Sequence, residues 1–117
     1  MYPLRYNIVM ELEIEIYETR SGKRPFADWI DGLKEVHTRA KIFTRLDRLK
    51  VGNFGDCKSI GSGVYELRIH YGSGIRIYYS KIGKKVVLLL CGGDKSSQKK
   101  DIRNAQAFLE DYKDRED

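Results

Sequence analysis

The chain has 117 residues, of which 41% are hydrophobic and 33% are charged, and its formal net charge is +5. This length predicts one domain with a hydrophobic core, spanning residues 1–117, and is too short for two. No apolar run approaches the length of a membrane-spanning helix, no N-terminal segment has the apolar region of a secretory signal, and Cys57 and Cys91 make no disulfide framework. We therefore expect a cytoplasmic protein with reduced thiols and no membrane partner.

The basic residues are concentrated in the middle of the chain. Residues 34–103 hold 16 Lys and Arg against 6 Asp and Glu, a net charge of +10, whereas residues 1–33 and 104–117 are both acidic. Aromatic residues are interleaved with this basic charge. The pattern favours a polyanionic partner such as nucleic acid over a surface of evenly mixed, solvated charge.

The first predicted elements are a strand and two helices. Residues 10–17 alternate apolar and acidic side chains, which predicts an edge strand with a charged outer face. Pro25 stands where a helix can begin, and apolar residues recur at helical spacing as far as Leu33. Residues 36–50 repeat apolar side chains at spacings of three and four, with basic residues between them, which predicts a second helix that ends in the loop at 52–56.

Three strands and a last helix follow. The strands are predicted at residues 64–70, 75–81 and 85–91. The third is apolar on both faces, which is typical of a central strand. Ser96 or Ser97 can cap the last helix, which is predicted to run to about Tyr112. The order β-α-α-β-β-β-α predicts an α+β fold, with the helices on one face of a mainly antiparallel, twisted sheet and basic residues on the other.

The pairing of the first two of these strands can be predicted from their alternation. A two-residue loop at 72–73 would pair Ile69 with Arg76 and mix apolar and charged side chains on one face. A three-residue loop at 72–74 pairs His70 with Arg76 and Arg68 with Tyr78, and only this register keeps one face of the hairpin apolar. We therefore expect these four side chains to share the exposed, basic face of the sheet.

This face indicates chemistry on RNA. The sequence lacks a phosphate-binding glycine loop, a metal-ligand spacing and a Ser-His-Asp arrangement, so neither a metal nor a cofactor is expected. A basic and aromatic surface suits a metal-free ribonuclease. In such an enzyme the 2′-hydroxyl of the RNA is the nucleophile, and the protein activates it, stabilises the charged phosphorane and helps the 5′-oxygen to leave.

Each of these residues also has a purely structural interpretation. Arg68 and Arg76 can pair with Glu66 and Asp94 as a surface network of charges. His70 can be no more than a polar residue of the sheet. Both interpretations stay open from the sequence alone.

Three stretches of the sequence resemble a known family. They are Phe26-Ala27-Asp28-Trp29-Ile30, Val64-Tyr65-Glu66-Leu67-Arg68 through Gly74-Ile75-Arg76-Ile77-Tyr78-Tyr79, and Leu89-Leu90-Cys91-Gly92-Gly93-Asp94-Lys95-Ser96-Ser97-Gln98 with Asp101-Ile102. Together they resemble the RelE/ParE superfamily of toxins from type II toxin–antitoxin systems, and within it the phage-type HigB branch, the addiction-module killer proteins. The resemblance implies a RelE-like fold and a metal-free, ribosome-dependent endoribonuclease that cleaves mRNA and inhibits translation. It also implies a cognate antitoxin, expected to be a helix-turn-helix DNA-binding protein.

The resemblance also assigns site residues. Arg68 and Arg76 match the basic positions of the second and third strands, and Lys95 matches a basic position after the last strand, although it can also lie only near the start of the last helix. Some members place an aromatic residue or His near the C-terminal end, where this chain has Gln98 or Asp101, so His70 becomes the candidate acid or base. The residues expected to contact RNA are Tyr78, Lys81, Lys84, Lys85 and Lys99.

Two other functions remain open at this stage. A ParE-like toxin would inhibit DNA gyrase without any cleavage chemistry. A nucleic-acid-binding module would use the same basic face without catalysis.

Overall fold

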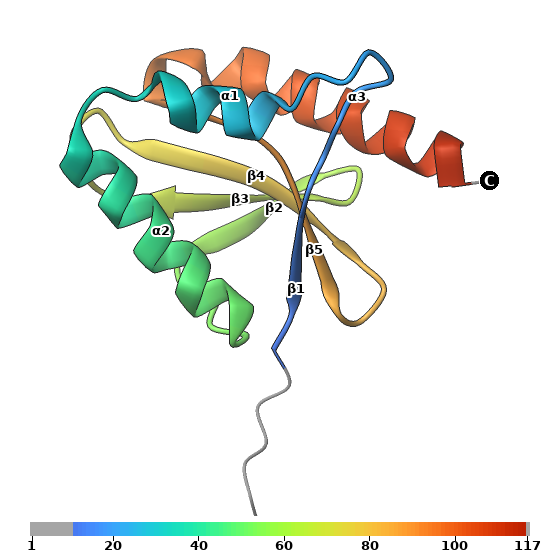
Figure 1. Ribbon diagram of the computed structural model, residues 1–117, viewed down its shortest axis with the longest axis horizontal. Helices are drawn as coiled ribbons and strands as arrows, with labels where there is room; N and C mark the ends of the chain where they lie inside the picture. The colour runs from blue at the N-terminus through green and yellow to red at the C-terminus, as the bar shows by residue number, and fades with distance from the viewer. Residues whose placement is uncertain (1–10, 117) are drawn as a thin grey trace, which may run out of the picture.

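The computed structural model describes residues 11–116, which form a twisted five-stranded sheet and three α-helices (Figure 1). The elements, in chain order, are β1 (Glu13–Ile16), α1 (Pro25–Gly32), α2 (Val36–Lys50), β2 (Cys57–Gly61), β3 (Val64–Ile69), β4 (Ile75–Ile82), β5 (Val86–Asp94), the short 3₁₀ turn η1 (Lys95–Ser97) and α3 (Gln98–Glu116). The predicted helices therefore form, and the last one extends beyond its predicted end. Met10, at the start of the predicted first strand, lies outside the described residues.

The strand order in the sheet is β1-β5-β4-β3-β2. β1 runs parallel to β5, and the other neighbouring strands pair antiparallel. The prediction of an α+β fold with a mainly antiparallel sheet is confirmed. β1 lies at the edge, and β5 lies inside the sheet, where its apolar side chains on both faces are buried.

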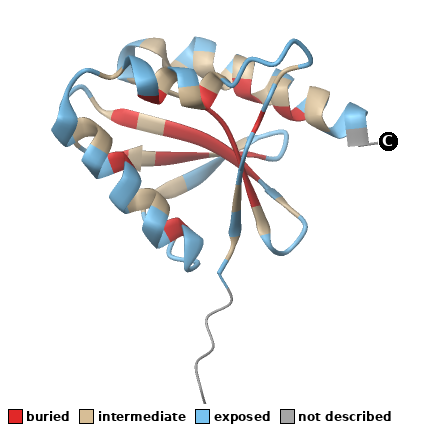
Figure 2. Cartoon of the chain, viewed as in Figure 1, coloured by how far each residue is buried: buried red, intermediate tan, exposed pale blue. Residues whose placement is uncertain are grey.

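The sheet carries a hydrophobic core on each face, which corrects the expectation that all helices pack on one face. One core joins Phe26 of α1 and Ile42 of α2 to Ile77 of β4. The other joins Tyr78 of β4 to Leu109 of α3. Because alternate positions of β4 and β5 are apolar on both faces, the sheet is covered by helices on both, and Figure 2 shows its central strands buried along most of their length.

β2 is an element that the sequence analysis does not predict. Its five residues, Cys57–Gly61, lack the apolar alternation of the other strands, and only Cys57 and Ile60 are partly buried. β2 pairs antiparallel with β3 across a tight turn in which Gly61, Ser62 and Gly63 have positive φ. The strand is therefore fixed by its turn and by pairing with β3 rather than by a hydrophobic pattern.

The register of β3 and β4 differs from the predicted one by two residues. Arg68 lies opposite Arg76 and Leu67 lies opposite Ile77, so the predicted pairs of His70 with Arg76 and of Arg68 with Tyr78 are wrong. The loop is longer than predicted because residues 70–74 lie outside both strands. A shift of two residues leaves every side chain on its predicted face of the sheet. Each side chain therefore has a different cross-strand partner from the predicted one but lies on the same side.

Two glycines at the end of β5 allow close packing on both faces of the sheet. A Cβ on Gly92 would clash with the ring of Trp29, and a Cβ on Gly93 would clash with the Asp101 carboxylate. Trp29 therefore packs against the core. Asp94 caps η1, the turn into α3, by accepting hydrogen bonds from the following backbone and from Ser96. The predicted Ser97 takes part in this cap, because its hydroxyl accepts a hydrogen bond from the Asp94 amide.

Candidate functional site

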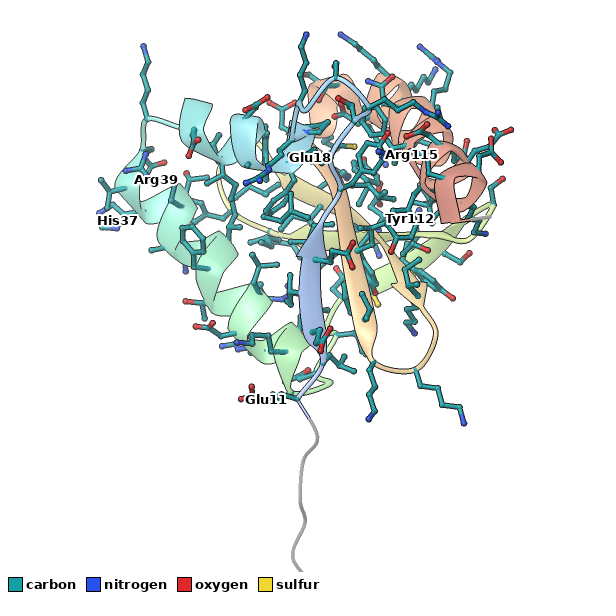
Figure 3. The ribbon with its side chains drawn as sticks, turned by 45° about the vertical axis from the view of Figure 1, so that its right-hand side comes forward. Glu11, Glu18, His37, Arg39, Tyr112 and Arg115 are labelled. Atoms are coloured by element: carbon teal, nitrogen blue, oxygen red, sulfur yellow. The ribbon has the colours of Figure 1, made fainter. Side chains whose placement is uncertain are left out.

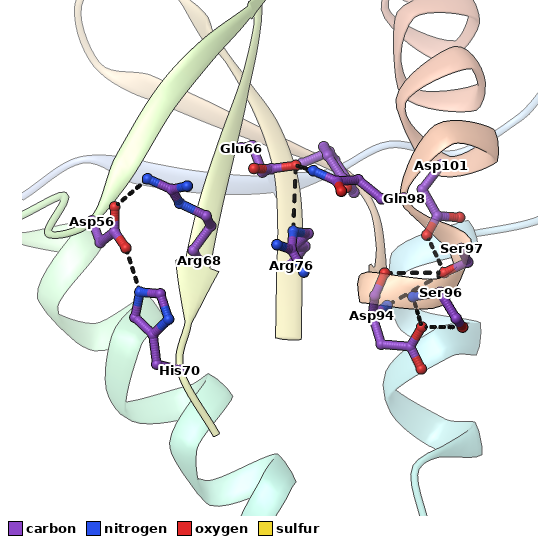
Figure 4. Close-up of polar contacts among 11 residues, drawn as sticks. Asp56, Glu66, Arg68, His70, Arg76, Asp94, Ser96, Ser97, Gln98 and Asp101 are labelled. Carbon is purple, nitrogen blue, oxygen red and sulfur yellow. Dashed lines mark hydrogen bonds and ion pairs between the residues drawn. The ribbon is translucent and has the colours of Figure 1, made fainter. Parts of the chain in front are cut away.

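The predicted arginines meet where β3 ends and β4 begins. Arg68 and Arg76 are direct cross-strand neighbours, and they share the face of the sheet that carries Glu66 and Tyr78. Like charges directly opposite each other in a sheet are destabilising unless negative groups lie between or beside them. The structure supplies a separate carboxylate to each guanidinium (Figure 4).

One half of the site is buried, and we call it the buried arm: Arg76, Glu66, Tyr78 and Gln98. Glu66 is fully buried, and its Oε2 accepts hydrogen bonds from the Tyr78 hydroxyl at 3.1 Å and from Gln98 Nε2 at 2.9 Å. Arg76, only 13% exposed, places Nε 3.6 Å from the same oxygen. Neither Glu66 Oε1 nor Arg76 Nε has a hydrogen-bond partner among the described residues.

The buried arm also determines the protonation state of the Tyr78 hydroxyl. Burial first, and then the neighbouring Glu66 carboxylate, raise the pKa of the Tyr78 hydroxyl far above its ordinary value. The hydroxyl therefore stays protonated and donates to Glu66. Because the ring is fully buried, the prediction that Tyr78 contacts RNA is wrong.

The other half is open to solvent, and we call it the open arm: Arg68, Asp56 and His70. The Asp56 carboxylate lies 2.9 Å from Arg68 Nη2 and 2.6 Å from His70 Nε2. These hydrogen bonds, the one with His70 contributing more, hold the pKa of Asp56 below its ordinary value. The His70 side chain is 79% exposed, and its Nδ1 has no hydrogen-bond partner among the described residues.

The backbone fixes the open arm to the sheet. The amide of Arg68 donates a 2.9 Å hydrogen bond to the backbone carbonyl of Asp56, which holds Asp56 beside the end of β3. The arrangement of Asp56 and His70 is one in which a carboxylate orients an imidazole by bonding one ring nitrogen and leaves the other available for proton transfer.

Lys95 lies close to the buried arm. A Cβ built on Gly74 would lie 3.4 Å from Arg76 Nη1 and 3.8 Å from Lys95 Cβ, so both residues flank this glycine. Gly74 has a φ of +83°, which glycine adopts readily. Lys95 is exposed, and the structure thus brings together four predicted residues: Arg68, His70, Arg76 and Lys95.

The remaining predicted basic residues lie elsewhere. Lys81 is on the opposite face, where its Nζ lies 4.6 Å from the ring centre of Phe54 and 4.8 Å from that of Tyr65. Lys84 and Lys85 are exposed at or beside the turn at the far end of β4 from Arg76. Lys99 is exposed in the first turn of α3.

Arg76 is more buried than predicted, and the two carboxylates of the site, Glu66 beside Arg76 and Asp56 beside Arg68, are not among the predicted site residues. The alternation of β3 does place Glu66 on the face of Arg68, so this pairing had a sequence signal. Asp56 had none, because it stands in an irregular loop before an unpredicted strand. The predicted surface network is present in a changed form, since Arg68 pairs with Asp56, and Arg76 with Glu66, while Asp94 is used as a cap.

The described residues show neither a metal-binding cluster nor a membrane-spanning helix. Within residues 11–116, no cluster of three or more His, Cys, Asp and Glu side chains has an arrangement that could hold a metal ion. No helix in that range is long and apolar enough to cross a membrane.

Comparison with known proteins identifies the family. Residues 28–113 match the family model described as Phage derived protein Gp49-like (DUF891). The chain belongs to this family. A protein of Haemophilus influenzae (strain ATCC 51907 / DSM 11121 / KW20 / Rd), described as an uncharacterized protein, is 46% identical over 86 residues, which are 74% of this chain and 87% of that protein. The matched region of this Gp49-like protein includes both arms of the site.

Proposed function

We propose that this Gp49-like protein is the toxin of a type II toxin–antitoxin module and acts as a ribosome-dependent mRNA endoribonuclease. The Gp49-like family is commonly associated with addiction-module killer proteins, in agreement with the resemblance to HigB-type toxins. The observation that carries the proposal is the cross-strand pair of Arg68 and Arg76, with an exposed, carboxylate-bound His70 beside it.

The scissile phosphate is the anion that this pair accommodates. Arg76 donates no hydrogen bond to any described residue, and Arg68 donates one from its side chain, from Nη2 to Asp56, which leaves its Nη1 without a partner among them. The Nε atoms of both residues are buried, so the terminal nitrogens are the donors that a ligand would meet. A phosphate oxygen between the guanidiniums would offset their repulsion and accept charge-assisted hydrogen bonds. The same contacts strengthen as charge develops on the phosphorane, which is the condition for catalysis, and Lys95 adds positive charge at the rim.

His70 supplies the proton transfer. In this scheme the Nδ1 nitrogen removes the proton of the RNA 2′-hydroxyl as that oxygen attacks the phosphorus, and Asp56 stabilises the resulting imidazolium. The bond from phosphorus to the 5′-oxygen breaks, the 5′-oxygen takes a proton from water, and the imidazolium of His70 gives its proton to the hydroxide that remains. The products are a 2′,3′-cyclic phosphate and a 5′-hydroxyl end.

Expression of this chain alone in bacteria tests the proposal. We expect growth arrest, with new mRNA 5′ ends clustered inside translated codons. Intact mRNA together with lost gyrase activity would instead support a ParE-like, non-enzymatic toxin, and intact mRNA with normal gyrase would leave only nucleic-acid binding. The proposed location is the cytoplasm, where ribosomes and mRNA are the partners.

The proposal includes neutralisation by a cognate antitoxin. Residues 34–103 carry a net charge of +10, which favours an acidic segment of the partner. Their association is expected to slow as salt rises, because exposed charges are screened over about 10 Å at 0.1 M ionic strength.

A further inference from the structure

A basic groove lies between α2 and the end of β3, beside the open arm of the candidate site, with which it shares His70. Its volume is about 530 Å³. Five of its nine lining residues are basic types, namely His37, Lys41, Arg45, Arg48 and His70, and none is acidic. Figure 3 shows His37 at the N-terminal end of α2, on the side of the molecule away from Tyr112 of α3.

The cations of this groove are not neutralised by carboxylates that line it. Arg45 donates to the backbone carbonyls of Arg68 at 2.9 Å and Phe54 at 3.0 Å, so its charge is fixed in place but has no anionic partner. Lys41 Nζ lies 5.3 Å from the centre of the Tyr71 ring. The side chain of Arg48 has no hydrogen bond or ion pair with any described residue.

Two acids approach the rim: Asp56, which binds His70 as part of the open arm, and Glu35. Glu35 accepts hydrogen bonds from the hydroxyls of Tyr71, at 3.1 Å, and Thr38, at 2.7 Å. These bonds hold it at the N-terminal end of α2 and lower its pKa. The floor and the α2 wall of the groove therefore keep an excess of positive charge.

The groove is continuous with the open arm. His70 lines the groove and also binds the Asp56 carboxylate, and Arg45 is attached to the carbonyl of Arg68, whose side chain is in the site. A polyanion that reaches the arginine pair would therefore find further cations next to it on the α2 side. The half-buried ring of Tyr71 adds an aromatic surface beside them.

We propose that this groove binds the phosphodiester backbone of the single-stranded RNA next to the bond that is cleaved. The inference rests on the proposed function and adds where the substrate strand lies. Lys41 and Arg48 contact phosphates, and Arg45 positions the β3 end and adds charge. These contacts carry no sequence information, so they contribute affinity and orientation.

A matched pair of substitutions in the last turn of α2 tests the groove. Arg48→Ala removes a charge that lines it, whereas Lys50→Ala removes one from the same turn outside the lining. The probe is a short 2′-O-methyl oligoribonucleotide, which cannot be cleaved because its nucleophile is blocked, and binding to the full chain is measured by fluorescence anisotropy at several salt concentrations. Thermal unfolding of both variants checks that the fold is retained.

We expect Arg48→Ala to weaken binding at least about threefold and to lower the slope of log K against log salt by about 0.7, the value for one lost contact with a single-strand phosphate. Lys41→Ala should behave likewise, and Lys50→Ala should leave both quantities close to the parent. Equal losses of affinity in Arg48→Ala and Lys50→Ala would overturn the proposal, because they would show that RNA binding depends on the net charge of the protein and not on this groove. No loss in any variant would overturn it as well.

Co-sedimentation with ribosomes and binding of an acidic partner protein, measured for the same variants, distinguish RNA from other ligands of the groove. If Arg48→Ala weakened co-sedimentation with ribosomes or binding of an acidic partner protein but not binding of the oligonucleotide, the groove would not hold the substrate strand. Failure of the proposed function looks different. A chain that cleaves no mRNA but still shows the Arg48–Lys50 difference binds RNA in this groove without being a ribonuclease.

Discussion

The two arms of the site use the same pair of chemical groups in opposite surroundings. In the buried arm, a fully buried Glu66 faces an Arg76 that is 13% exposed, and two further side chains hold the carboxylate. In the open arm, Asp56 faces Arg68 at the surface and shares its carboxylate with an exposed His70. Burial makes the first pair costly to break, whereas water screens the second.

This difference in burial indicates that Arg76 is preorganised, whereas Arg68 and His70 can change their partners. Arg76 is held by its surroundings before any ligand arrives, as a group that stabilises a transition state must be. Arg68 and His70 can exchange Asp56 for water or substrate at little cost. We infer that the buried arm fixes the position of the phosphate and that the open arm moves protons.

The largest effect is expected from Arg76→Ala. Cleavage should fall about a hundredfold or more, equivalent to about 3 kcal/mol of lost transition-state stabilisation. The folded state should also lose about 3 kcal/mol, because Glu66 remains as a buried carboxylate without its cation. Urea denaturation and a cleavage assay measure the two losses separately.

The control for that loss is the double variant Arg76→Ala/Glu66→Gln. Neutralising the buried carboxylate should restore much of the stability while cleavage stays low. Lys at position 76 should recover part of the activity, since it keeps the charge but not the fork of donors. If Arg76→Ala remained as toxic as the parent, the phosphate assignment would be wrong.

In the open arm, we expect His70→Ala to lower cleavage without the large loss of stability that is expected for Arg76→Ala. Loss of the proton-transfer group should lower cleavage about a hundredfold. Stability should change by less than about 1 kcal/mol, because the removed side chain is 79% exposed. Asp56→Asn, which keeps the shape but removes the charge opposite the imidazole, should lower cleavage less and change its pH profile. An unchanged rate in His70→Ala would remove it from the mechanism.

A smaller effect is expected for Lys95→Ala. This exposed side chain adds charge at the rim near Arg76 and makes no ion pair among the described residues, so its removal should cost about threefold to tenfold in cleavage and little stability. Lys99→Ala is the matched control from the first turn of α3. Equal losses in both would mean that net charge, rather than the position of Lys95, matters.

The smallest expected effect is an acid dependence of stability. The folded-state pKa of Asp56 lies below its ordinary value of 3.8, so its stabilisation is present above that value and is lost as pH falls through the folded pKa. Asp56→Asn lacks this contribution. The difference in urea midpoint between parent and Asp56→Asn should therefore shrink between about pH 5 and about pH 3, and a constant difference would contradict the pairing.

Much of the fold can be predicted from local sequence patterns. The parts that could not be predicted have physical causes. The helix at 36–50 is predicted by its periodicity and the strand at 85–91 by its continuous apolar run, and the sequence displays both directly. β2 depends on pairing with β3, and helices on both faces depend on how α3 packs, neither of which a local pattern contains.

The site divides in the same way. Alternation places Arg68 and Arg76 on one face, and this relation survives the error in register. The burial of Tyr78 results from α3, and the role of Asp56 results from a loop folding back to the end of β3. A residue's face could thus be predicted from the sequence, but its partners across the fold could not.

The chemistry of the cleaved RNA ends tests the central claim most directly. Purified full-length protein is incubated with translating ribosomes and a defined mRNA, and the new termini are characterised in the parent and in Arg76→Lys. We predict a 2′,3′-cyclic phosphate and a 5′-hydroxyl inside translated codons, with the yield lowered in the variant. Intact mRNA, or cleavage that leaves a 5′-phosphate, would contradict it.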